Sequence, residues 1–341
     1  MKKILAMALA VSLTFGTVIA PELSNISTIH TMAYSDLLKD YPYFDDEEED
    51  ESNKPEIKTS GDFNYYVQKD GTICIKKCNC LEDESKTEVV VPETIDGKKV
   101  TVIGYNAFRN SKYIKKVTLP NTISVIDESA FYECKELEDI NIPNGTKIIY
   151  SHAFTNCTKL SKIVIPESME SIESFAFQNC TNLTDVELPS DFTNFSVWSF
   201  NDTAWLENLK KENQLVIVNN SLVYANPAAQ NITIPDGVKK IGDFAFKVCN
   251  VKKVEIPDSV EVIGSHAFDS CDYLSEVNIP STLKEIGDSA FTGCWNLKTI
   301  AIPDGITEIR DNTFKDCSNI RSITIPDSVT KISTNAFLYC S

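Results

Sequence analysis

A phenylalanine recurs along this 341-residue chain every 23 residues, inside the pattern A-F-x-x-C-x-x-L-x-x-I-x-I-P. The steps are 23 residues from Phe108 to Phe200 and, after one long gap, 22 or 23 from Phe246 to Phe337. A fixed period of this length is typical of a solenoid, in which each unit buries its apolar side only by stacking on its neighbours. The repeat therefore predicts one long array, with an open surface rather than an enclosed pocket.

Each repeat is expected to form one turn of a coil that contains a short strand. In the strand that ends at Pro143, Ile140 and Ile142 point to one face, whereas Asp139 and Asn141 point to the other. The proline ends the strand because it has no N–H to donate. Phenylalanine is the largest inward side chain, and the predicted core ladder consists of Phe108, Phe131, Phe154, Phe177, Phe246, Phe268, Phe291, Phe314 and Phe337.

The run I-G-x-x-A-F-x-x-C-x-x-L-x-x-I-x-I-P resembles the BspA-like leucine-rich repeat family of bacterial surface proteins, over about residues 61–341. The resemblance implies a β-rich α/β repeat solenoid, a right-handed coil with stacked parallel short strands. It also implies a secreted or surface-displayed protein that is used in adhesion or protein recognition. The family supplies no catalytic residues to transfer to this chain.

The N-terminal 33 residues have the features of a bacterial secretory signal peptide. Two lysines precede an apolar run, and small residues follow it, with cleavage expected after Ala20 or after Ala33. An uncleaved anchor is the alternative, although the apolar stretch only reaches the lower limit of about 17 residues for a membrane span. The signal predicts a location outside the cell, either secreted or on the bacterial surface.

Residues 34–60 are expected to form a disordered acidic linker. An unbroken acidic run over residues 45–51 repels itself and cannot bury apolar surface. Capture of calcium or of a basic partner is the alternative function for this run. The whole chain has a formal charge of −17, which disfavours nucleic acid and anionic membranes as partners.

Two segments depart from the repeat. Residues 61–88 are predicted to form an N-terminal cap, a hairpin that turns around Asp70-Gly71 and covers the first turn. Residues 201–229 are predicted to form an insertion, with a short helix followed by a hairpin at Asn219-Asn220. The array reaches Ser341 in the middle of a repeat without a polar cap, so self-association through this end, or truncation of a longer product, is expected.

Eight of the eleven cysteines follow the repeat phenylalanine by three residues. Side chains in such a ladder point in parallel, about a strand spacing apart, so they are predicted to be buried free thiols rather than disulfides. Cys74, Cys78 and Cys80 lie outside the repeat pattern. They too are predicted to be structural or surface thiols, with a disulfide among them or a zinc site as alternatives.

No pattern in the chain predicts catalysis. His152 and His266 occupy a repeat position that other turns fill with Ser, Phe or Asn, which indicates a tolerant surface position. Phosphate-binding glycine loops, G-x-S-x-G and H-E-x-x-H are absent from the sequence. We therefore expect no enzyme, no cofactor, no metal ion and no small-molecule substrate.

Two groups of residues are candidates for contact with a partner. The first is a cluster of aromatic residues that should be exposed around the insertion: Phe192, Phe195, Trp198, Trp205 and Tyr224. The second is the outward face of the strands, represented by Lys116, Asp139, Lys162, Asp185, Lys253 and Glu276. The strand face has no aromatic side chains, which disfavours a glycan groove there.

The sequence thus predicts a secreted or surface protein that binds a host or bacterial surface protein, of unknown identity. A glycan-binding accessory module and a passive structural spacer are the alternatives. Fold does not determine function, so the residues of the surface must decide between them.

Overall fold

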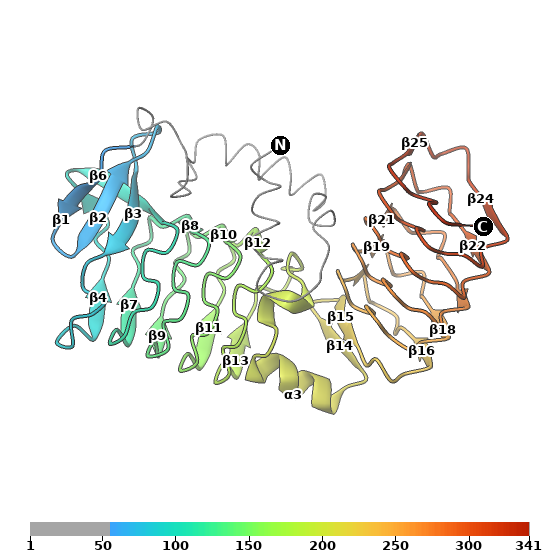
Figure 1. The fold of residues 1–341 in the computed structure, drawn as a ribbon, viewed down its shortest axis with the longest axis horizontal. Helices are drawn as coiled ribbons and strands as arrows, with labels where there is room; N and C mark the ends of the chain where they lie inside the picture. Colours follow the sequence, from blue (N-terminus) through green and yellow to red (C-terminus); the bar gives the residue numbers. More distant parts are fainter. Residues whose placement is uncertain (1–54, 341) are drawn as a thin grey trace. The chain divides into compact units, whose positions relative to one another are not determined.

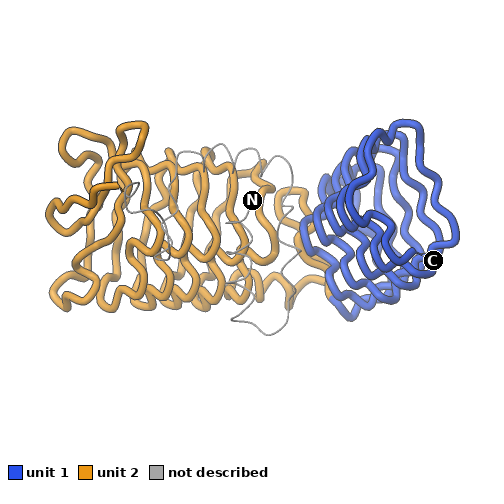
Figure 2. The backbone as a smooth tube through the Cα atoms, turned by 45° about the horizontal axis from the view of Figure 1, so that its top comes forward, with its two compact units in different colours: residues 1–39, 227–341 blue, residues 40–226 orange. Residues whose placement is uncertain are grey.

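The computed structural model describes residues 55–340, so the predicted signal peptide and most of the predicted linker lie outside the described residues. The chain divides into two compact units, which Figure 2 distinguishes by colour. Within the described residues, unit 2 comprises residues 55–226 and unit 1 comprises residues 227–340. No helix of the described residues is long and apolar enough to cross a membrane.

Unit 2 begins with the predicted capping hairpin. Strands β2 (Phe63–Val67) and β3 (Ile73–Cys78) pair antiparallel, and β3 then pairs in parallel with β6 (Lys98–Ile103) in the first turn of the coil. Gly71 makes the reversal possible with a φ of 85°. A further strand, β1 (Lys58–Ser60), pairs with β2, so the predicted boundary of the linker at residue 60 is wrong by three residues.

The turns of unit 2 build two ladders of short parallel strands, which Figure 1 shows as a lower and an upper row. The register advances by one repeat per strand, as in Val117↔Ile140 and Ile126↔Ile149. The lower row contains β4 (Glu88–Val90), β7 (Lys116–Thr118), β9 (Asp139–Ile140), β11 (Lys162–Val164) and β13 (Asp185–Glu187). The upper row continues from β6 through β8 (Val125–Ile126), β10 (Ile148–Ile149) and β12 (Ser171–Ile172), and β5 (Thr94–Ile95) pairs with β6.

Unit 1 repeats this arrangement. Its parallel ladders are β16 (Asn231–Thr233), β18 (Lys253–Glu255) and β20 (Glu276–Val277); β17 (Lys240–Ile241), β19 (Val262–Ile263) and β21 (Glu285–Ile286); β22 (Thr299–Ala301) and β24 (Ser322–Thr324); β23 (Glu308–Ile309) and β25 (Lys331–Ile332). The last turn exposes Ile332 and Tyr339. Self-association through this end stays a prediction.

The predicted ladder of phenylalanine rings is confirmed. From Phe108 to Phe200 the rings stack almost parallel, with centroids 4.8–5.1 Å apart. From Phe246 to Phe337 they stack at 4.7–5.6 Å. All but Phe337, which is partly exposed, are buried. The chain is therefore a solenoid of stacked turns, as the repeat predicts.

The repeat cysteines are free thiols, also as predicted. Seven of them donate the thiol hydrogen to the carbonyl oxygen of the phenylalanine one turn earlier, at Sγ–O distances of 3.0–3.2 Å; for example, Cys134 donates to Phe108. Burial raises the pKa of Cys249 to about 12. The thiol of Cys249 therefore stays protonated at neutral pH, and the seven donor thiols serve as hydrogen-bond partners of the backbone.

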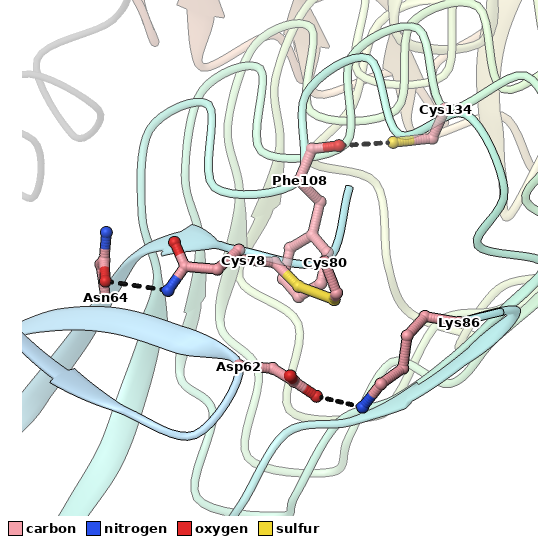
Figure 3. The surroundings of a disulfide bond; sticks show 8 residues. Asp62, Asn64, Cys78, Cys80, Lys86, Phe108 and Cys134 are labelled. Carbon is pink, nitrogen blue, oxygen red and sulfur yellow. Dashed lines mark hydrogen bonds and ion pairs between the residues drawn. A yellow bond between two sulfur atoms is a disulfide. The ribbon is translucent and has the colours of Figure 1, made fainter. Parts of the chain in front are cut away.

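The preferred interpretation of Cys78 and Cys80 as free thiols is wrong, because the two form a disulfide (Figure 3). The backbone N–H of Cys78 donates to the carbonyl oxygen of Ala107, and that of Asn79 donates to Asp62. These bonds hold the end of β3 in a tight turn with the two Cα atoms 5.5 Å apart, which is within the range of a disulfide.

The insertion has the predicted helix and hairpin. A 3-10 helix η2 (Val197–Phe200) precedes helix α3 (Ala204–Glu212), where the hydroxyl of Thr203 accepts a hydrogen bond from the backbone N–H of Leu206. Strands β14 (Leu215–Val218) and β15 (Ser221–Ala225) then pair antiparallel. Asn219 and Asn220 have φ values of 49° and 59°, as this hairpin turn requires.

Each turn except that of Phe200 also contains two residues in the left-handed backbone region. One precedes the repeat phenylalanine by two residues, and the other follows it by two. His152 and His266 occupy the first position, with φ values of 59° and 53°, and His266 is buried. The prediction that this is a tolerant surface position is therefore wrong. The side chain varies from turn to turn, but every residue that occupies the position in these turns adopts the left-handed backbone conformation.

Truncation of a central ring should unfold unit 2 readily. Phe154→Ala is expected to lower the free energy of unfolding by about 3–5 kcal/mol, because the cavity lies between two stacked rings. The matched control is Phe337→Ala in unit 1, whose partly exposed ring should cost less. Urea denaturation of both variants measures the difference, and equal losses would contradict the ladder as the source of stability.

Reduction of the disulfide should have a small effect. The bridge joins residues only two apart, so it removes little loop entropy from the unfolded chain. The double variant Cys78→Ser, Cys80→Ser is expected to lose about 1–2 kcal/mol. Thermal unfolding with and without reductant measures this loss, and collapse of the whole coil on reduction would contradict it.

Candidate interaction surface

The predicted aromatic cluster around the insertion is largely part of the core. Phe192 and Phe195 are only 7% and 6% exposed, so their prediction as exposed contact residues is wrong. Their rings stack 5.8 Å apart, and Phe195 also contacts the edge of Phe200. The side-chain amide of Asn219 donates to the carbonyl oxygens of Pro189 and Phe192, which fastens the hairpin to this segment.

The remaining members of that cluster are half-buried and hold the insertion in place. The indole of Trp205 packs edge-on against Phe200, and its backbone N–H donates to the carbonyl oxygen of Leu183. The ring of Tyr224 lies 5.1 Å from the ammonium group of Lys210. Trp198 contacts the ring of Phe175 on the surface of unit 2. Only Trp198 therefore belongs to a surface that extends beyond the insertion.

The charged residues of the strand face are exposed, as predicted, but in unit 2 they neutralise one another across the ladder. The ammonium group of Lys116 lies 2.6 Å from the Asp139 carboxylate, and that of Lys162 lies 3.0 Å from Asp185 and also contacts Glu187. The hydrogen bond with Asp139 raises the pKa of Lys116. Exposed pairs of this kind contribute about 0–1 kcal/mol each, so they fit a solvated strand face better than a binding site.

In unit 1 the strand face is slightly hollowed. An open depression of about 550 Å³ lies over β18 and β20, and the structure brings Lys253 and Glu276 together there. Lys253 forms an ion pair with Glu255 on its own strand. No aromatic side chain lines the depression, so it offers little to anchor a partner.

A surface that the sequence analysis missed lies on one edge of unit 1. Four large apolar side chains are exposed in the loops that follow the repeat phenylalanine; we call them the apolar edge. Val248 is 60% exposed, Tyr273 54%, Trp295 54% and Tyr339 66%. Trp and Tyr are the residue types that most often dominate the energy of protein interfaces.

The fold does not require apolar residues on this edge. In the turns of unit 2 that follow Phe131, Phe154 and Phe177, the position of Trp295 holds Lys135, Thr158 and Thr181, and that of Tyr273 holds Glu136, Lys159 and Asn182. This comparison within one chain was available from the sequence alone. Alignment of the turns, rather than inspection of single residues, would have revealed the apolar edge.

Two members of the apolar edge have side chains that are unfavourable for the backbone conformation at their positions. Val248 and Tyr339 have φ values of 60° in the left-handed position, where unit 2 has Asn110, Asn156 and Asn179. This conformation costs a β-branched or bulky residue more free energy than it costs asparagine. Such strain is characteristic of positions selected for contact rather than for stability.

The rings of Tyr273 and Trp295 are free to receive a partner. Within the described residues neither ring stacks on another ring, and neither phenol nor indole forms a hydrogen bond. The backbone of Trp295 is held firmly, because its N–H donates to Gly293 and its carbonyl oxygen accepts from the Asn319 side chain. At Trp295 the backbone is therefore held by hydrogen bonds, whereas its ring has no partner among residues 55–340.

The geometry at His266 is not that of a nucleophilic site. In unit 1 the imidazole Nδ1 of His266 lies 3.0 Å from the Asp269 carboxylate, and the hydroxyl of Ser270 donates to the same carboxylate. A nucleophilic serine would instead donate to the imidazole. Although burial raises the pKa of Asp269, the hydrogen bond from His266 and the charge of Lys247 bring it below its usual value. The group is thus a buried ion cluster.

No group of three metal-ligating side chains occurs in residues 55–340. Cys74 lies close in sequence to the disulfide but remains a buried free thiol, and burial raises its pKa to about 12. Because Cys78 and Cys80 are consumed by the disulfide, the alternative of a zinc site at these three cysteines is wrong.

Comparison with solved structures finds bacterial repeat proteins. A leucine-rich cell surface protein from Faecalibacterium prausnitzii is 28% identical, with 85% of this chain and 93% of that chain covered and a TM-score of 0.40. A leucine-rich repeat protein from Bacteroides ovatus is 24% identical, with 83% and 92% covered and a TM-score of 0.39. No curated protein is similar enough in sequence to be matched.

The family models give a direct assignment. The model of the BspA-type leucine-rich repeat region, with six copies, matches residues 101–227 and 216–341. These two matches contain every ring of the predicted phenylalanine ladder. The chain therefore belongs to the BspA-type leucine-rich repeat family.

Proposed function

We propose that this protein is a secreted or surface-displayed bacterial adhesion module, which binds another protein through the apolar edge of unit 1 and catalyses no reaction. The observation that carries the proposal is the exposure of Val248, Tyr273, Trp295 and Tyr339 at positions where the turns of Phe131, Phe154 and Phe177 have polar residues. Val248, Tyr273 and Trp295 belong to three consecutive turns, and large apolar groups exposed in this way favour an interaction site.

The family and the N-terminal sequence support the location. The Faecalibacterium relative is described as a cell surface protein, and the proposal extends this location to the present chain. The signal-like segment of residues 1–33 lies outside the described residues and supports export by its composition alone. The partner is expected to be a host or bacterial surface protein.

A glycan partner is the second candidate, because among residues 55–340 the rings of Tyr273 and Trp295 are unstacked and their polar atoms have no hydrogen-bond partner. Against it, Val248 and Tyr339 extend the edge with purely apolar or strained groups, which suit a protein surface better. A passive spacer would not require any of the four exposed apolar residues of the edge. The two kinds of partner can be separated chemically.

Replacement of the central anchor should abolish most of the binding. Trp295→Ala is expected to weaken saturable binding to a bacterial or host cell surface by about tenfold or more, as for other interface anchors. Thr158→Ala, on the corresponding edge of unit 2, is the matched control and should bind like the unchanged protein. Protease treatment of the target surface should remove the binding, and periodate oxidation of its glycans should not. Loss after periodate only would favour the glycan, and no saturable binding would favour the spacer.

A second variant separates contact from stability. Val248→Asn should raise the free energy of unfolding of unit 1 by about 1 kcal/mol, because asparagine adopts the left-handed conformation more cheaply and little buried surface is lost. The same change should weaken binding. Chemical denaturation and a binding titration on one sample measure both, and a variant that is stabilised yet binds unchanged would remove Val248 from the site.

A further inference from the structure

Two cations on the strand face of unit 1 lie side by side without an acid; we call them the cation pair. Lys298 precedes β22 and Arg321 precedes β24, and both are exposed. The backbone N–H of Arg321 donates to the carbonyl oxygen of Lys298. Within residues 55–340 neither side chain forms an ion pair or a hydrogen bond. The outward residues of the two strands are threonine, serine and alanine, so neither strand supplies an acid.

The corresponding turns of unit 2 show an opposite charge at this position. Lys115 and Glu138 are joined by the same backbone hydrogen bond, and their side chains form an ion pair at 3.6 Å. Neighbouring strands lie about 4.8 Å apart, and like charges directly opposite each other destabilise a sheet. Lys298 and Arg321 therefore reduce the stability of a coil that elsewhere compensates this charge, in a chain with a formal charge of −17.

The cation pair adjoins the apolar edge. Trp295 precedes Lys298 by three residues, so their Cα atoms are at most about 11 Å apart. The side-chain amide of Asn319, two residues before Arg321, donates to the carbonyl oxygen of Trp295 at 2.6 Å and joins the two turns. A single segment can therefore contact Trp295 and both cations.

The charges around the apolar edge define how such a segment would be oriented. Asp272 is next to Tyr273, and Asp316 lies in the following loop but one, so acids are present in the loops themselves. The cation pair lies where the loops end and the strands begin. An occupant with an apolar half and an acidic half would place its apolar residues on the loops and its carboxylates at the strands.

One segment of this chain has both halves. Residues 41–51 read Y-P-Y-F-D-D-E-E-E-D-E, in which three aromatic residues lead directly into the unbroken acidic run. These residues lie outside the described part of the chain, and both expected cleavage positions, after Ala20 and after Ala33, leave them in the exported protein. Carboxylates pair strongly with arginine and lysine, and aromatic residues are frequent anchors at interfaces. The acidic run thus has a matching basic surface on the same protein.

We propose that residues 41–51 of a second copy of this chain dock on the apolar edge and the cation pair of unit 1. The inference rests on the proposed function, because it takes the apolar edge as a contact surface and names one occupant. A second copy supplies the segment, since six residues tie the acidic run to β1 in the cap of unit 2, whereas the site belongs to unit 1. Each copy has one segment and one site at different places, so the contact joins copies head to tail.

A synthetic peptide of residues 40–53 is the first probe, in a fluorescence-anisotropy titration of the dilute full chain. It should bind saturably, and Trp295→Ala, Lys298→Ala and Arg321→Ala should each weaken binding by about threefold or more. The matched control is Lys284→Ala, which removes an exposed lysine of unit 1 that pairs with Glu261, and it should change the affinity less. Absence of peptide binding, or equal affinity for all four variants, would overturn the proposal.

Two altered peptides test whether both halves of the segment are needed. One has serine at positions 41, 43 and 44 and keeps every charge, and the other has asparagine and glutamine throughout positions 45–51 and keeps the aromatic residues. Each should bind at least about threefold more weakly than the natural peptide. Binding of the charged peptide at full affinity would indicate general attraction of acids and contradict the proposed site. Because the protein is unaltered, misfolding cannot explain a difference.

Sedimentation velocity tests the second copy. The full chain should form oligomers as its concentration rises. The double variant Lys298→Ala, Arg321→Ala should lose this association, and so should a chain neutralised at positions 45–51, although general charge repulsion would make the neutralised chain associate more. A mixture of the two altered chains should form a one-to-one complex, because one keeps the segment and the other keeps the site. No complex in the mixture would rule out the contact between copies, and a monomer that binds the peptide only after its own run is neutralised would assign the segment to the same chain instead.

Failure of this inference can be told apart from failure of the proposed function. If the peptide does not bind while Trp295→Ala still weakens binding to a cell surface, only the contact between copies is wrong. If Trp295→Ala changes neither kind of binding, the apolar edge is not an interaction site and both proposals are wrong.

Discussion

The structure depends on face-to-face stacking of one phenylalanine per turn. Each ring covers the ring of the next turn at about the spacing of neighbouring strands, so the side-chain stack and the backbone hydrogen bonds advance together. In seven turns the thiol then bonds the carbonyl oxygen beside the previous ring, as a second donor to an oxygen that already accepts a backbone N–H, for example in Phe131 and Phe268. Where the first turn of unit 2 has Ser111 in place of the cysteine, its buried hydroxyl has no partner in the part of the chain that the structure describes. The core is therefore specified by contacts between adjacent turns, and each turn needs its neighbours.

This dependence on neighbours explains which parts of the fold could be predicted from sequence. The ring ladder, the free thiols, the capping hairpin at Gly71 and the hairpin at Asn219-Asn220 follow from period, spacing and turn chemistry, all of which are local. Phe192 and Phe195 lie outside the repeat pattern, so their burial is decided by packing against the insertion and has no local signature. The disulfide likewise depends on bonds to Ala107 and Asp62, which are distant in sequence.

The candidate site was harder to predict than the fold for a related reason. Residues of the apolar edge, like His152 and Phe175, occupy positions where the repeat accepts many side chains, and such variety resembles an absence of constraint. The constraint is in the backbone, since His152, Phe175 and Val248 all adopt a left-handed conformation. Residue type alone does not reveal the requirement for a positive φ, because asparagine, serine and histidine all adopt it, each with a different free-energy cost. The charged strand face was equally misleading, because its ion pairs are visible only once the register is known.

In a repeat protein, the free energy of folding that a residue costs at its position separates functional positions from indifferent ones. In a globular domain an exposed tryptophan has no internal reference, because no other position has the same environment. Here every turn repeats the environment, so Lys135, Thr158 and Thr181 show that the position of Trp295 needs no aromatic residue. The asparagines at 110, 156 and 179 similarly show that Val248 is not the most favourable residue for its backbone. A side chain that is exposed, replaceable and unfavourable for folding contributes little to the stability of the coil, and this is the observation on which the proposed contact with a partner rests.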